Sequence, residues 1–320
     1  MFRPADVLLL FVVFSSMLVG ILAPEVAGYL RPYPLYCMMF LLFLSFLSLE
    51  LSEIGKILRQ RIPMTLWLVF CKLVLFPLLI FLVLKFTFPR FAIAGLLLSG
   101  VSTGVVAPFI STLVRSNKGL VLLLVVVSSM LVPFTLPALV KVVAGRSVAM
   151  SLWGMMRVLG LIVFVPMALV ELMRKFAPSL AQAISRRRYP ISLAIFAIIN
   201  FGVFSKYSSY FRQSPDALLS ASLVALFLGG VLFILGLACA WHAAADDKMA
   251  SAIAAANINN VLIIVFSARF FGPLEATVAA MYMIPFFLVL FPMRAYERFV
   301  STREAGSGKC HGVTYICLYF

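Results

Sequence analysis

The sequence predicts an all-α polytopic membrane protein with ten transmembrane helices. Of its 320 residues, 64% are hydrophobic and 12% are charged, whereas soluble domains have about 45–50% and about 25%. The apolar residues also come in runs of about 18–25, the length that crosses a bilayer as a helix. A single aqueous core could not bury this much apolar surface. Soluble and disordered classes are therefore excluded.

The ten expected spans follow one another with short connections. Spans four and nine are interrupted by residues that break or weaken a helix. The spans are 6–23, 34–49, 63–85, 91–115, 119–143, 151–173, 190–205, 217–241, 249–270 and 274–293.

Lysine and arginine are unevenly divided between the two sides of the predicted membrane. Sixteen lie on the side that carries both termini and eight on the other, while Lys72 and Arg157 fall within spans. Basic residues accumulate on the cytoplasmic side, so both termini are expected there, in a multi-pass protein of the cell inner (plasma) membrane. The net charge of +15 follows from this orientation. We expect membrane lipid and no nucleic acid as partners, and the sequence specifies no oligomeric state.

The two halves of the chain share landmarks at nearly constant spacing. The pairs are Tyr33-Pro34 with Tyr189-Pro190, Arg115 with Arg269, and Pro133 with Pro285, at offsets of 156, 154 and 152 residues. Five spans per half is an odd number, so the second repeat would be inverted. Inverted repeats with helices broken at matching positions are typical of secondary transporters.

These landmarks predict a single transmembrane transporter domain over residues 1–300. Repeat one would cover about 5–145 and repeat two about 150–297. Residues 301–320, which contain Gly, Ser and Lys, are expected to form a flexible cytoplasmic tail.

Small and polar residues gather at the centre of the fourth span. Pro108 lacks a backbone N–H, and glycine weakens the helix around it. A helix broken here presents backbone amides and a positive dipole end, which suit an anionic group. We therefore expect Ser102, Thr103, Gly104 and Pro108 to line a substrate site.

The ninth span carries Asn257, Asn259 and Asn260 at its centre. Three amides at membrane depth are costly unless they pair with each other, with freed backbone or with a ligand. They are expected to face the break in span four across the midplane. Asn200, central in the seventh span, is also expected to face this crossing. The alternative is that these polar side chains only join helices to one another.

These segments resemble the bile acid:sodium symporter family over about residues 5–297. The resemblance rests on the ten-span layout and on four stretches. They are GVSTGVVAP (100–108), SSMLVPFTLP (128–137), ANINNVL (256–262) and FFGPLEATVAAMYMIP (270–285). It implies two inverted five-helix repeats that form a core domain and a panel domain. It also implies transport of organic anions such as bile acids, steroid conjugates, pantoate or keto acids, usually with sodium.

The sequence departs from this family at the residues that hold sodium. An ungapped match puts Ala107-Pro108 where the family has Ser-Asn, and puts Val121 and Val125 at polar ligand positions. In span nine the family's glutamate becomes Ala255, its glutamine becomes Asn259, and Asn260 is retained. Sodium remains possible as a coupling ion although its usual ligands are missing, and we expect no cofactor and no metal site.

Lys72 lies nine residues past Pro63 in span three. A rise of 1.5 Å per residue puts it about 13 Å into the membrane. The resemblance places a sodium-holding glutamine close to this position. One hypothesis is that the Lys72 ammonium replaces the sodium charge. The alternative is that Lys72 extends to the interface or pairs with a structural carbonyl.

These features predict a secondary transporter of a small organic anion that works by alternating access. One alternative is an effluxer of the same fold, like the auxin or arsenite carriers. Another is a membrane sensor or scaffold that does not transport. We do not expect an enzyme, because the chain has two histidines and lacks H-E-x-x-H, G-x-S-x-G and P-loop motifs.

Overall fold

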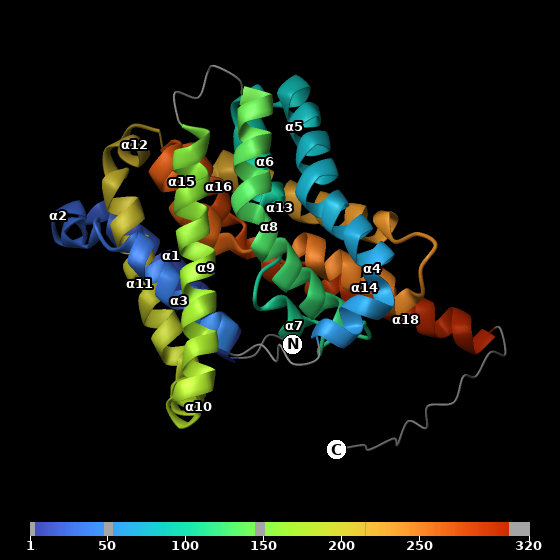
Figure 1. The fold of residues 1–320 in the computed structure, drawn as a ribbon. Helices are drawn as coiled ribbons and strands as arrows, with labels where there is room; N and C mark the ends of the chain where they lie inside the picture. The colour runs from blue at the N-terminus through green and yellow to red at the C-terminus, as the bar shows by residue number, and fades with distance from the viewer. Residues whose placement is uncertain (1–3, 48–53, 145–150, 215, 307–320) are drawn as a thin grey trace.

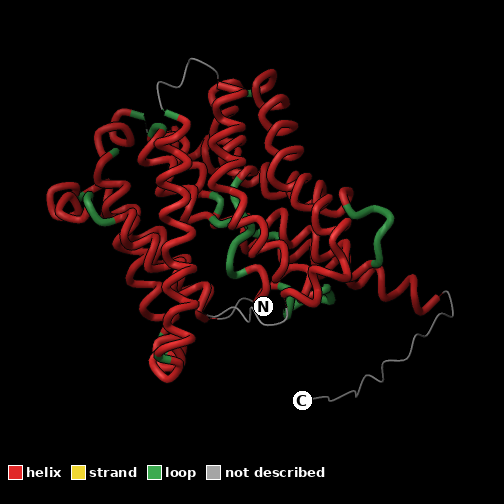
Figure 2. Tube along the Cα trace, in the orientation of Figure 1, coloured by secondary structure: helices red, strands yellow, loops and turns green. Residues whose placement is uncertain are grey.

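The computed structural model describes residues 4–47, 54–144, 151–214 and 216–306, and these residues form helices and no strand (Figure 2). The helices follow the predicted apolar runs, which confirms the all-α class. The helices of the first half are α1 (Pro4–Leu22), α2 (Pro24–Ala27), η1 (Gly28–Leu30), α3 (Pro34–Leu47), α4 (Ile54–Phe70), η3 (Cys71–Leu75), α5 (Phe76–Thr87), η4 (Pro89–Phe91), α6 (Ala92–Gly100), α7 (Ala107–Ile110) and α8 (Lys118–Ala144).

The second half begins after the predicted repeat boundary at residues 145–150, which lies outside the described residues. Its helices are α9 (Leu152–Phe176), α10 (Pro178–Arg186), α11 (Arg188–Lys206), α12 (Ser208–Gln213), α13 (Asp216–Cys239), α14 (Ala245–Ala256), α15 (Asn260–Phe270), α16 (Pro273–Met281), α17 (Met283–Leu288) and α18 (Leu290–Gly306). Helix α18 extends into the predicted tail, and the rest of that tail (307–320) lies outside the described residues.

Within the described residues, six helices are long and apolar enough to cross a membrane, or seven if a pair near the N-terminus that bends by 104° is one span. The number is below ten because α3 has only 14 residues and because the breaks divide spans four and nine into short pieces. The structure therefore supports a multi-pass helical membrane protein. The arrangement of ten helices in two inverted repeats stays a prediction.

The helices pack in two groups (Figure 1). The crossing group contains α4–α8 and α13–α17, together with the turns η3 and η4. The flanking group contains α1–α3 and α9–α12, together with η1. Each group draws on both halves of the chain. Between the groups, α8 packs on α9, and α15 packs on α3 and α11.

Small residues allow helices of the crossing group to pack closely. At Gly236 of α13, an added Cβ would lie 2.6 Å from the Ala252 Cα of α14. Small residues at such interfaces let helix backbones approach each other, and the resulting van der Waals contacts hold helices together inside a membrane.

Gly236→Ala is therefore expected to force α13 and α14 apart and to lower the melting temperature, at a cost of about 1–3 kcal/mol. Gly230→Ala on the same helix is the matched control, because its Cβ would meet no atom within 4 Å. The measurement is thermal unfolding in detergent. Equal melting temperatures for the two variants would contradict this packing.

Candidate functional site

The site is built on the two helix breaks of the crossing group. The first break joins α6 to α7, and the second joins α14 to α15. They meet at an isolated antiparallel bridge between Thr103 and Ile258. Because a break frees backbone groups inside the hydrocarbon region, those groups need other partners. Each break supplies partners for the other.

Two backbone hydrogen bonds hold the breaks together. The Gly104 N–H donates to the Asn257 carbonyl at 2.7 Å, and the Asn259 N–H donates to the Ser102 carbonyl at 2.9 Å. The four residues come from two predicted site segments that lie more than 150 positions apart in the sequence. The structure therefore brings the polar centres of spans four and nine into direct contact, as the sequence predicts.

Side chains reinforce this contact from both sides. The Thr103 hydroxyl donates to the Ala254 carbonyl at 2.9 Å, and the Thr103 N–H donates to the Ser128 hydroxyl at 3.0 Å. On the other side, the Tyr282 hydroxyl donates to the Ala256 carbonyl at 2.8 Å. All three side chains are buried. The polar core is therefore fixed by α8 on one side and by the α16–α17 junction on the other.

The three predicted asparagines have different roles in this core. The Asn259 side-chain oxygen caps α15 by accepting from the Leu262 N–H at 3.3 Å. The Asn257 side-chain amide donates to the Phe286 carbonyl, and the Asn260 side-chain amide donates to the Met283 sulfur. The side-chain oxygens of Asn257 and Asn260 are buried and have no hydrogen-bond partner in the structure. These two oxygens are therefore available as acceptors.

The N-terminal ends of the half-helices α7 and α15 are weaker anion sites than two uncapped positive dipole ends would be. Helix α7 has four residues, with Pro108 in its first turn, so its dipole is weak. Helix α15 has 11 residues, but one amide of its first turn, that of Leu262, is already capped by the Asn259 side chain. The amides at these helix starts therefore offer less to an anion than the sequence suggests.

Asn200 makes its contacts elsewhere. Its side-chain amide donates to the Val13 carbonyl at 3.2 Å and to the Ser16 hydroxyl at 3.1 Å, both on α1. These bonds join two helices of the flanking group. A single polar residue in an apolar run gives no indication of which neighbouring helix it will face.

Lys72 lies beside the breaks. It is in the π-helical turn η3 and is 4% exposed, and its Nζ donates to the Ala255 carbonyl at 3.0 Å. Ala255 is in the last turn of α14, where unpaired carbonyls form the negative end of the helix dipole. The ammonium therefore compensates that end. A carbonyl partner was one of the two interpretations of Lys72 from the sequence, and π-turns are frequent at functional sites.

A small cavity borders the Lys72 side chain. Three hydroxyl-bearing residues from different elements line it, together with apolar side chains. They are Thr103 from the first break, Ser128 from α8 and Ser251 from α14. The cavity has room for about one water molecule. Ser251 was not among the predicted site residues, because a serine in an alanine-rich helix resembles ordinary small-residue packing.

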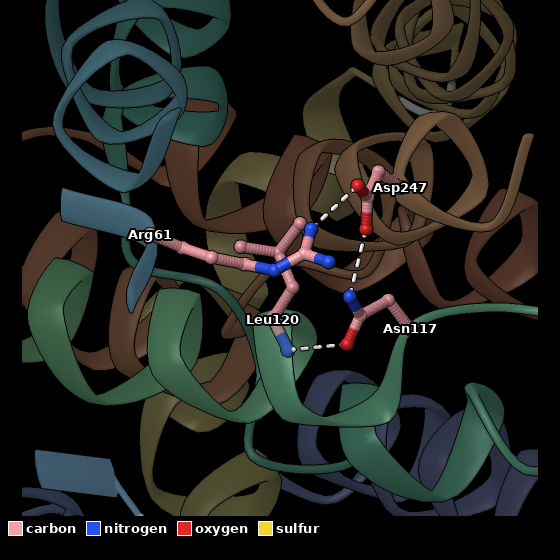
Figure 3. A network of polar contacts seen from close by, with 4 residues as sticks. All are labelled: Arg61, Asn117, Leu120 and Asp247. Atoms are coloured by element: carbon pink, nitrogen blue, oxygen red, sulfur yellow. Dashed lines mark hydrogen bonds and ion pairs between the residues drawn. The ribbon is translucent and has the colours of Figure 1, made fainter. Parts of the chain in front are cut away.

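A polar network joins three elements of the crossing group at one end of the molecule (Figure 3). The Arg61 guanidinium pairs with the Asp247 carboxylate at 2.5 Å, and the other carboxylate oxygen accepts from the Asn117 amide at 2.7 Å. Asn117 in turn accepts from the Leu120 N–H at 3.0 Å. The network links α4, the start of α8 and the first turn of α14. It therefore joins the second broken span, at the start of α14, to α4 and to the segment between α7 and α8.

Comparison with known proteins gives the family. The sequence profile of the Sodium Bile acid symporter family matches residues 35–214, more than half of the chain. The chain belongs to this family. It is also 28% identical over 239 residues to "Uncharacterized protein YbaS" of Bacillus subtilis (strain 168), a match that covers 71% of this chain and 74% of that protein.

This membership confirms the resemblance to the family; the matched residues include the first break and end before the second. Members of this family are membrane transporters rather than enzymes. Several positions that the resemblance assigns to sodium are apolar here, whereas Asn259 and Asn260 are polar. Val121 and Val125 are fully buried, and Ala255 contributes only its carbonyl oxygen, which binds Lys72.

The contact between the breaks requires a glycine at position 104. An alanine Cβ there would lie 2.6 Å from the Ile258 carbonyl oxygen, a backbone atom that cannot rotate away. We expect Gly104→Ala to separate the breaks and lower the melting temperature, at a cost of about 1–3 kcal/mol. Gly160→Ala is the control, because its nearest neighbour would be a Phe164 ring carbon at 3.8 Å. A Gly104→Ala protein as stable as this control would refute the requirement.

Proposed function

We propose that this member of the Sodium Bile acid symporter family is a secondary carrier of a small organic anion that works by alternating access. The crossing group would act as the core and the flanking group as the panel. The observation that carries the proposal is the buried contact between the two broken helices, with a lysine ammonium beside it. Broken helices that meet near the midplane are the usual substrate and ion sites of such carriers.

The sequence offset of the residues bridged between the breaks supports an inverted repeat of five helices per half, because it lies within the range of spacings of the other paired landmarks. An offset of 155 residues relates Ser102 to Asn257, Thr103 to Ile258, and Gly104 to Asn259. Under this offset each of the two backbone bonds becomes the other. A two-fold axis in the membrane plane that passes through the bridge would produce this exchange.

The substrate would bind at this crossing. Ser102, Gly104 and Pro108 lie on the first break or directly after it, and the buried Ser102 hydroxyl has no hydrogen-bond partner in the structure. The free oxygens of Asn257 and Asn260 lie on the second break. Unpaired polar groups inside a membrane are costly. These groups are therefore suited to take partners from a bound ligand.

Lys72 would supply the charge that sodium supplies in relatives. In carriers with broken helices, the C-terminal end of a half-helix coordinates the coupling cation, and the Lys72 ammonium binds that end of α14. A lysine at the bilayer centre costs roughly 2.5–3.5 kcal/mol. A resident ammonium that offsets the helix dipole would make transport independent of sodium. With the predicted orientation, both termini would be cytoplasmic.

Flux through proteoliposomes tests this proposal. We expect saturable uptake of at least one labelled anion from a panel of bile acid conjugates, hydroxy acids and keto acids, at equal rates in sodium and in choline. Lys72→Gln should lower uptake by about ten- to hundredfold, because a hydrogen bond made by a charged group is worth about 1.5–3 kcal/mol. Lys141→Gln, at an exposed lysine of α8, is the control.

Four results would contradict parts of this account. Uptake that depends on sodium would reject the role of Lys72, as would full uptake by Lys72→Gln. A ligand that raises the melting temperature but shows no flux in either direction would favour a sensor over a carrier. Flux only from the cytoplasmic face would indicate an effluxer of the same fold.

A further inference from the structure

The crossing and flanking groups are joined by side-chain hydrogen bonds at one end of the molecule. Lys206, the last residue of α11, donates through Nζ to the Ala268 carbonyl at 3.0 Å. The next residue, Tyr207, donates its hydroxyl to the same carbonyl at 2.9 Å. Arg90 of η4 donates to the Tyr210 hydroxyl of α12 at 3.0 Å. Figure 1 shows α12 and α15 at the same end of the molecule.

The Ala268 carbonyl is a strong acceptor for a local reason. Helix α15 ends at Phe270, so the carbonyls of its last turn lack intrahelical donors. The N–H four residues after Ala268 belongs to Gly272, and it donates to the Glu275 carboxylate at 3.0 Å instead. Two donors from the flanking group therefore complete the last turn of a helix in the crossing group.

Tyr207 is suited to remain a donor. Burial, and then the negative charge of the nearby Glu275, raise the pKa of the Tyr207 hydroxyl above its ordinary value. The phenol is therefore protonated throughout the neutral range and can hold the Ala268 carbonyl. Glu275 lies in the first turn of α16, so Tyr207 also lies near a second element of the crossing group.

At the opposite end, the polar contacts given for the described residues run within each group. The Arg61–Asp247 pair joins elements of the crossing group, and Arg174 donates to the Phe46 and Leu47 carbonyls within the flanking group. Asp247 is in the first turn of α14 and Ala268 in the last turn of α15, so these contacts mark opposite ends of one broken span. The two ends of the molecule are therefore fastened differently.

We propose that Lys206 and Tyr207 form a gate that closes the substrate route at the α12 end by holding the end of α15. This inference rests on the proposed alternating access and adds the contacts that must break when the two groups separate. In the predicted orientation, this end faces away from the cytoplasm. Lys206 and Tyr207 are positioning residues, since they touch α15 rather than the crossing.

Cysteine labelling tests the gate without requiring transport. Ser267 is fully buried beside Ala268, so Ser267→Cys reports opening at this end in a protein whose native cysteines are replaced by alanine. A membrane-impermeant maleimide is added outside proteoliposomes. Lys206→Met with Tyr207→Phe should raise the labelling rate by about tenfold or more, because it removes one hydrogen bond made by a charged group and one made by a neutral group.

Matched variants separate gating from general loosening. Lys141→Met with Tyr36→Phe makes the same chemical changes at two exposed side chains and should leave labelling unchanged. Ser251→Cys in α14 reports the other half of the broken span and should not respond to the gate variant. Faster labelling confined to position 267 supports the gate even if the flux assay detects no transport. Unchanged labelling at 267, or an equal rise at 251, overturns it.

Discussion

The reciprocal backbone hydrogen bonds between the two helix breaks are the constraint on which the rest of the structure depends. A polypeptide that leaves the helical state inside a membrane must satisfy its freed amides and carbonyls without water. Gly104 and Asn257 meet this requirement for each other, as do Asn259 and Ser102. Since neither break could be buried without the other, α6–α7 and α14–α15 form one unit. The hydroxyls of Ser128 and Tyr282, the close packing of α13 on α14 and the network around Asp247 all support that unit.

A second regularity concerns the excess of basic residues. Several cationic side chains donate hydrogen bonds to backbone carbonyls at the C-terminal ends of neighbouring helices. They are Arg31 on α11, Arg174 on α3, Lys206 on α15, Arg212 on α1 and Lys72 on α14. A cation at a helix C-terminus is favoured by the dipole, so a chain with 26 Lys and Arg against 11 Asp and Glu can still satisfy its charges. Lys72 is the deepest of these contacts, and it alone lies beside the breaks.

Much of this arrangement could be predicted from local sequence signals. The helix class, the position of both breaks and the depth of Lys72 follow from apolar run length, from Pro108 and from clustered asparagines. Partners of single polar residues could not be predicted, because they depend on packing between distant segments. Asn200 therefore binds α1 instead of the crossing, and Tyr282 was missed although it caps the end of α14. Span counting by length also fails where a functional break shortens the helices.

The central claim is that an ammonium occupies the place of a coupling cation at the end of α14. The most direct test is the melting temperature of the purified protein in sodium and in choline at matched ionic strength. An ion that binds the native state raises its stability by mass action. The account predicts equal melting temperatures for the wild-type protein in the two salts. A rise specific to sodium would contradict it, because the cation site would then be open and Lys72 would not fill it.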